Sequence, residues 1–168
     1  GAVTSSMPST SDLTGLRELR AIVDQGTPIR SVVHDSRQIV PGSLYACLRG
    51  DHHDGHAFAA DAVAAGATAL LVDHPLDHVD VPQIVVDDTR LRLGPIAAEV
   101  AGHPSRSLAT VGATGTNGKT TTAALLASIF DGAGMPCGVI GTLHGPRTTP
   151  EAPELQAVLR EFVDAGKS

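Results

Sequence analysis

The sequence predicts an α/β protein in which a small N-terminal α/β domain precedes the start of a parallel-sheet, Rossmann-like domain. Short apolar runs typical of buried strands alternate with helical patterns, as they do in parallel sheets. A glycine-rich segment at 115–122 lies between one such strand and a helix. A cluster of chain-breaking residues at 102–105 separates that segment from the elements before it.

The first domain is predicted to extend over residues 1–104. Its helices are indicated by leucines at helical spacing from Leu13 to Ile22, by an alanine-rich segment that Gly66 ends, and by 91–100. Gly94-Pro95 is expected to break the last helix or to delay its start to Pro95. Four apolar runs predict strands, at 29–34, 44–48, 69–72 and 84–86.

The second domain is predicted to begin at residue 105 and to continue to residue 168. A strand at 108–112, a helix at 119–131 and a strand at 137–141 would form one βαβ unit. Apolar residues from Leu155 to Val163 recur at helical spacing and predict an amphipathic helix. One βαβ unit and one helix cannot cover both faces of a parallel sheet, so we expect this domain to be truncated.

Composition narrows the class of protein. A formal net charge of −6 over 168 residues argues against a general nucleic-acid binder. No apolar run approaches membrane-spanning length, so we expect no membrane association. Cys47 and Cys137 are too few for a disulfide framework and are expected to be small buried hydrophobes in a cytoplasmic protein.

The glycine-rich segment predicts a site for ATP and Mg²⁺. Glycines let successive backbone N–H groups and a helix N-terminus point at phosphates. Lys119 would neutralise the outer phosphates, and the Thr120 hydroxyl would ligate the metal. Ala113 stands where the strict phosphate-loop pattern has glycine, so the loop is a variant. The predicted nucleotide-binding residues are Gly115, Thr116, Asn117, Gly118, Lys119, Thr120 and Thr121.

This loop variant resembles the ATP-binding loop of the Mur ligase superfamily, and further motifs resemble one branch of it. That branch adds the third residue of the peptidoglycan stem peptide (the MurE type). The resemblance extends over about residues 29–166. Its motifs are Asp35-Ser36-Arg37-Gln38, Pro41-Gly42-Ser43-Leu44-Tyr45-Ala46, Asp54-Gly55-His56, Ile140-Gly141-Thr142-Leu143 and Thr148-Thr149-Pro150-Glu151-Ala152-Pro153.

The resemblance implies an ATP-dependent carboxylate–amine ligase acting through an acyl phosphate. Its partners would be UDP-N-acetylmuramoyl-L-alanyl-D-glutamate and an amino acid, meso-diaminopimelate or L-lysine. We expect a monomer, and we expect the fragment itself to be inactive. The resemblance implies a catalytic role for Lys119 and Thr120, and substrate contacts for His34, Ser36, Asp51, His52, His53, Thr148 and Thr149.

Several alternatives stay open at this point. His52 and His56 would share one face if helical and could hold a metal, but 51–56 could instead be a polar loop or a substrate contact. Thr148 and Thr149 could simply start a helix. The protein could be a related ligase, either D-alanyl-dipeptide-adding or folylpolyglutamate synthetase. It could also be a module that senses ATP without catalysis.

Overall fold

The computed structural model describes residues 10–50, 53–141 and 150–167. The chain divides into two compact units, 1–100 and 101–168, and each is described by itself. In the described part of the chain, no helix is both long and apolar enough to cross a membrane.

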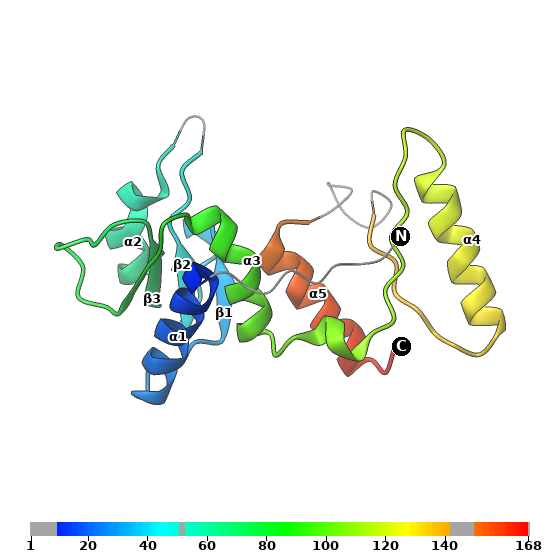
Figure 1. Ribbon diagram of the computed structural model, residues 1–168, viewed down its shortest axis with the longest axis horizontal. Helices are drawn as coiled ribbons and strands as arrows, with labels where there is room; N and C mark the ends of the chain where they lie inside the picture. The colour runs from blue at the N-terminus through cyan, green and yellow to red at the C-terminus, as the bar shows by residue number, and fades with distance from the viewer. Residues whose placement is uncertain (1–9, 51–52, 142–149, 168) are drawn as a thin grey trace. The chain divides into compact units, whose positions relative to one another are not determined.

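Unit 1 is built around a four-stranded sheet of order β1-β2-β3-β4 in which every neighbouring pair is parallel. The sheet and its helices are visible in Figure 1. In chain order the elements are α1 (Thr10–Asp24), β1 (Ser31–Val33), the short helix η1 (Ser36–Gln38), β2 (Ser43–Ala46), the short helix η2 (Gly55–Phe58), α2 (Ala59–Ala64), β3 (Ala67–Val72), β4 (Gln83–Val85) and α3 (Thr89–Val100).

Helices cover both faces of this sheet. Helices α1 and α3 pack against each other, α1 also contacts β4, and α3 contacts β1. Helix α2 packs on β3, on the opposite side of the strands in Figure 1. Because side chains alternate along a strand, each strand supplies both cores. The core on the α2 face contains Tyr45, Cys47, Ala59, Ala62, Ala67, Leu70, Val72 and Leu76.

The expected break in the last helix of unit 1 is wrong. Helix α3 runs without interruption from Thr89 to Val100 with Pro95 inside it. A proline in a helix interior removes one hydrogen bond and costs roughly 3 kcal/mol. Here Leu93, Ile96 and Ala97 are buried along the same helix. Burying each large apolar side chain contributes about 1.5–3 kcal/mol, which offsets the cost of the proline.

Unit 2 contains η3 (Pro104–Ser107), α4 (Lys119–Gly132) and α5 (Ala152–Asp164), with α5 packed against η3. The predicted strands at 108–112 and 137–141 are wrong, since neither segment forms a strand among the described residues. A strand needs hydrogen-bonding neighbours, and an isolated pair is marginal at best. Without a sheet to cover, α4 leaves Leu125 and Ile129 more than half exposed.

The two cysteines are free, and the structure predicts different reactivities for them. Cys47 is completely buried, and burial, followed by the charges of Asp54 and Asp73, raises the pKa of its thiol to about 12. Cys137 is only half-buried. Because the thiolate is the reactive species, a thiol reagent at pH 8 should label Cys137 in the native protein and both thiols after denaturation. Rapid labelling of a native Cys137→Ser variant, in which Cys47 is the remaining thiol, would contradict the burial of Cys47.

Candidate functional site

The loops that carry chemistry in unit 1 gather at one edge of the sheet. All four strands are parallel, so their carboxyl ends lie at the same edge. Ser36 begins η1 just after β1, the segment 47–55 follows β2, and Asp73 follows β3. In open parallel sheets, ligands bind in the crevice outside this edge. The topology therefore brings together residues that are far apart in the sequence.

The turn after β1 is held by an ion pair between neighbours. The Asp35 carboxylate accepts hydrogen bonds from the Arg37 guanidinium, with an Nη2–Oδ2 distance of 2.7 Å, and from the Arg37 backbone N–H at 3.0 Å. These bonds, the guanidinium first, lower the pKa of Asp35 to about 2. The structure thus pairs Arg37 with Asp35. Ser36 lies half-buried between them, and His34 is half-buried just before.

The loop after β2 is closed at its base by backbone hydrogen bonds. The Gly50 N–H donates to the His53 carbonyl at 2.9 Å, and the Gly55 N–H donates to the Leu48 carbonyl at 2.8 Å. The Tyr45 hydroxyl donates to the Gly55 carbonyl at 3.2 Å. His53 is exposed in this loop. The predicted contacts Asp51 and His52 lie outside the described residues.

Gly55 is required by the close approach of the backbone in this loop. A Cβ at residue 55 would lie 2.7 Å from the Leu48 nitrogen and 2.9 Å from the Leu48 oxygen, so the backbone itself would have to move. We expect Gly55→Ala to lower the free energy of unfolding by about 1–3 kcal/mol, the usual cost of overpacking. Urea denaturation measures this change.

Gly50→Ala is the matched control, because its Cβ would make one contact, at 3.3 Å from the His53 oxygen. It should cost less than Gly55→Ala. Equal stability losses in the two variants would contradict the close approach at Gly55.

A network around His56 was missed by sequence reasoning. His56 Nδ1 lies 2.5 Å from Asp54 Oδ1, and the Asp73 backbone N–H donates to His56 Nε2 at 3.3 Å. Hydrogen bonds from His56, its backbone N–H first, lower the pKa of Asp54. Burial alone raises the pKa of Asp73, but hydrogen bonds from His74 and Arg49 outweigh it and lower that pKa. Both carboxyls are therefore ionised at neutral pH.

The signal for this network was present in the strand order. Asp73 and His74 follow the strand adjacent to β2, so they reach the edge where His56 lies. The sequence analysis considered a metal site shared by His52 and His56, but His52 lies outside the described residues. His56 instead contacts Asp73 and His74, which lie 17 and 18 positions further along the chain.

In unit 2 the glycine-rich loop leads directly into a helix. Gly115 and Gly118 have φ values of 151° and 82°, which L-residues rarely adopt, and Lys119 is the first residue of α4. Lys119 Nζ donates to the Gly115 carbonyl at 2.5 Å, so the lysine folds back over the loop. Thr120 follows it, exposed in the first turn of α4. This arrangement suits phosphate binding at a helix N-terminus, with a hydroxyl beside it for Mg²⁺.

The remaining predicted site residues are placed only in part. Thr116, Asn117 and Thr121 are exposed in the loop and at the start of α4. Thr148 and Thr149 lie outside the described residues. Helix α5 begins at Ala152, close after them in the sequence.

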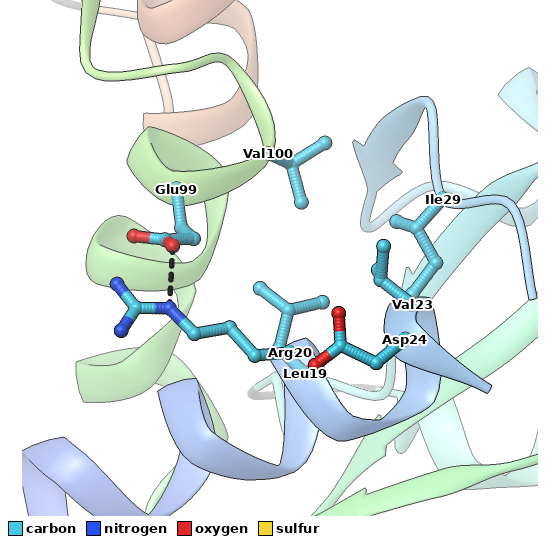
Figure 2. A pocket seen from close by; sticks show the side chains of 7 residues that line it. All are labelled: Leu19, Arg20, Val23, Asp24, Ile29, Glu99 and Val100. Carbon is cyan, nitrogen blue, oxygen red and sulfur yellow. Dashed lines mark hydrogen bonds and ion pairs between the residues drawn. The ribbon is translucent and has the colours of Figure 1, made fainter. Parts of the chain in front are cut away.

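One groove of about 240 Å³ lies elsewhere in unit 1, and Figure 2 shows its lining. Arg20 Nε donates to Glu99 Oε1 across it at 2.8 Å. Ile29 precedes β1 and Glu99 is near the end of α3, so the groove lies at the amino edge of the sheet. That edge is opposite to the one where parallel sheets bind ligands. The groove residues are Leu19, Arg20, Val23, Asp24, Ile29, Glu99 and Val100.

Family models match both units of the chain. Residues 28–101 match the model described as "Mur ligase family, catalytic domain". Residues 113–168 match the model described as "Mur ligase middle domain". The two matches lie on the two units separately, one on the parallel sheet and the other on the glycine-rich loop with α4 and α5.

Curated relatives extend this similarity. The UDP-N-acetylmuramyl-tripeptide synthetase of Roseiflexus sp. (strain RS-1) is 42% identical over 153 residues, which cover 83% of this chain and 30% of that protein. The UDP-N-acetylmuramoyl-L-alanyl-D-glutamate--2,6-diaminopimelate ligase of Geobacillus kaustophilus (strain HTA426) is 43% identical over 141 residues, covering 79% of this chain and 29% of that protein. The chain therefore spans less than a third of the length of these relatives.

A solved structure shares the fold. It is described as a UDP-N-acetylmuramoyl-L-alanyl-D-glutamate--2,6-diaminopimelate ligase and aligns with a TM-score of 0.66 at 26% identity. The alignment covers 83% of this chain and 30% of that structure.

Proposed function

The chain belongs to the Mur ligase family, and we propose that it is part of the ligase that adds the third amino acid to UDP-N-acetylmuramoyl-L-alanyl-D-glutamate. The observation that carries this proposal is the sequence identity of 42% and 43% to relatives named for that reaction. The glycine-rich loop at the start of α4 supports it, because such a ligase needs a phosphate site for ATP.

The proposed reaction has two steps. A carboxylate oxygen of the muramoyl dipeptide attacks the γ-phosphorus of ATP, and ADP leaves. The amino group of the incoming amino acid then attacks the acyl carbon, losing a proton, and inorganic phosphate leaves as the amide forms.

Lys119 is the residue of this chain that would act in the first step. It would release the Gly115 carbonyl and hold the γ-phosphoryl oxygens, while the backbone N–H groups at the start of α4 orient the phosphates. Thr120 is the residue that would hold Mg²⁺, which supplies charge neutralisation on the phosphates when bound.

Unit 1 would supply the site for the uridine end of the substrate. Ser36 and the loop through His53 lie at the carboxyl edge of adjacent strands, where a nucleotide has access to both. His34, Asp51 and His52 are proposed to contribute there. Thr148 and Thr149 are proposed to meet the peptide near the transferred phosphate. Monomeric assembly and function in the cytoplasm stay predictions.

A substrate panel tests this function on a full-length enzyme that contains this chain. We expect ADP release and a new amide, detected by mass spectrometry, with UDP-N-acetylmuramoyl-L-alanyl-D-glutamate plus meso-diaminopimelate or L-lysine. Turnover confined to the UDP-muramoyl tripeptide with D-alanyl-D-alanine, or to folate with glutamate, would move the protein to another branch. ATP binding without ADP formation under all conditions would contradict a ligase.

A further inference from the structure

Three side chains at the carboxyl edge of unit 1 converge on one point. His56 Nε2 lies 3.2 Å from Asp73 Oδ1, and His74 Nδ1 lies 2.5 Å from the same oxygen. One possible ligand atom from each of the three residues lies within 4.8 Å of the other two. The imidazole rings of His56 and His74 stack with their centroids 4.7 Å apart. Two imidazoles and a carboxylate are a donor set typical of zinc.

The hydrogen bonds of His56 indicate which ring nitrogen faces Asp73. Its Nε2 accepts the Asp73 backbone N–H, so the ring proton belongs on Nδ1, which then donates to Asp54. The single Nε2 lone pair is engaged in that 3.3 Å hydrogen bond, which a metal on Nε2 would replace. Nε2 also lies close to the carboxylate oxygen of Asp73, another electron-pair donor. The contact between two such atoms at 3.2 Å is stabilised when a cation binds both.

Asp54 completes an arrangement common at metal sites. A histidine that ligates a metal usually donates its other ring N–H to a carboxylate, which fixes the tautomer and raises the basicity of the ligand. The His56 side chain is only 6% exposed, so its orientation is fixed by its surroundings as well as by Asp54.

The distances suit a small tetrahedral ion. Ligand atoms at 2.0–2.1 Å from a zinc ion in tetrahedral geometry are about 3.3 Å apart. The separation between His56 Nε2 and Asp73 Oδ1 already has this length. The His74 side chain is 50% exposed and can change rotamer to take the third position.

We propose that His56, Asp73 and His74 form a zinc site in unit 1. The site uses other residues than the Mg²⁺ position proposed at Thr120, and it does not depend on the proposed ligase activity. Arg49 binds Asp73 mainly through Oδ2, with Nε 2.7 Å from it, while its Nη2 lies 3.3 Å from Oδ1, a long contact that a metal on Oδ1 would replace. Imidazole ligands favour zinc and neighbouring transition metals over Mg²⁺ and Ca²⁺, which prefer oxygen.

Titration of the 168-residue chain with Zn²⁺ alone, by calorimetry, and with Co²⁺ alone, by visible absorption, tests this site. We expect one equivalent of zinc to bind and cobalt to show the absorption of tetrahedral coordination. His74→Ala and Asp73→Asn should each weaken zinc binding by at least about tenfold, since loss of even an outer partner has that effect. His74 and Asp73 are preferred to buried His56 as test positions because their loss threatens folding less.

His78→Ala is the matched control, because His78 is an exposed histidine of the same unit. It should bind zinc as the unmodified chain does, and circular dichroism should show the same fold in every variant. Absence of stoichiometric zinc binding, or equal affinity in folded His74→Ala, would overturn the proposal and leave a hydrogen-bonded histidine–aspartate network.

Discussion

Replacing Lys119 with alanine is expected to lower kcat/KM for ATP-dependent ligation about 10²–10³-fold in a full-length enzyme that contains this chain. The loss corresponds to roughly 2.7–4 kcal/mol, the usual effect of removing one electrostatic contact to a transition state. Lys119 starts α4 and donates only to the Gly115 carbonyl of its own loop among its described hydrogen bonds. The variant should therefore fold normally, and steady-state kinetics measures the defect.

Lys167→Ala is the matched control, because Lys167 is the other lysine of the chain. Its ammonium donates to the Cys137 carbonyl at 3.1 Å and lies 4.9 Å from the centre of the Phe162 ring. Its loss removes local contacts within unit 2 and should change turnover little. Unchanged turnover in Lys119→Ala would contradict the assignment of the glycine-rich loop to phosphate binding.

Replacing Leu70 with alanine is expected to lower the free energy of unfolding by about 2–5 kcal/mol, the range for deleting a buried leucine side chain. Leu70 is completely buried in β3, in the core that also contains Tyr45. Tyr45 in turn donates to the Gly55 carbonyl in the loop at the carboxyl edge. A cavity at Leu70 should therefore destabilise the sheet and loosen the loop that it supports. Urea denaturation measures the change.

Leu91→Ala provides the comparison for this loss of stability. Leu91 is 66% exposed on α3 in the same unit, so its truncation should change stability by less than about 0.5 kcal/mol. Similar losses in Leu70→Ala and Leu91→Ala would contradict the core on the α2 face.

Sequence patterns were sufficient to locate the strands of unit 1 because these strands are short and contain strong local signals. The apolar run at 69–72 lies within β3, and the run at 44–48 overlaps β2. The patterns failed at Pro95, where tertiary burial on the sheet overrides a local helix breaker. They failed again at 108–112, where a strand depends on partners that local sequence does not specify.

The candidate site, like the fold, was predictable only in part from the sequence. The glycine-rich loop was found because its residues are contiguous, and the structure places Lys119 at the start of a helix. The contact between His56 and Asp73 was missed because it joins residues 17 positions apart through the order of the strands. Roles for Ser36 and His53 came from family resemblance, and they stay proposals.

Binding of UDP-N-acetylmuramoyl-L-alanyl-D-glutamate to the 168-residue chain, measured by calorimetry, tests most directly the proposal that unit 1 recognises this substrate. One equivalent should bind. Ser36→Ala should weaken the affinity about fivefold, corresponding to one lost hydrogen bond of about 1 kcal/mol. Lys119→Ala should bind the uridine end as the unmodified chain does, because Lys119 belongs to unit 2. Absence of binding, or full affinity in the folded Ser36→Ala variant, would contradict the uridine site at the carboxyl edge of the sheet.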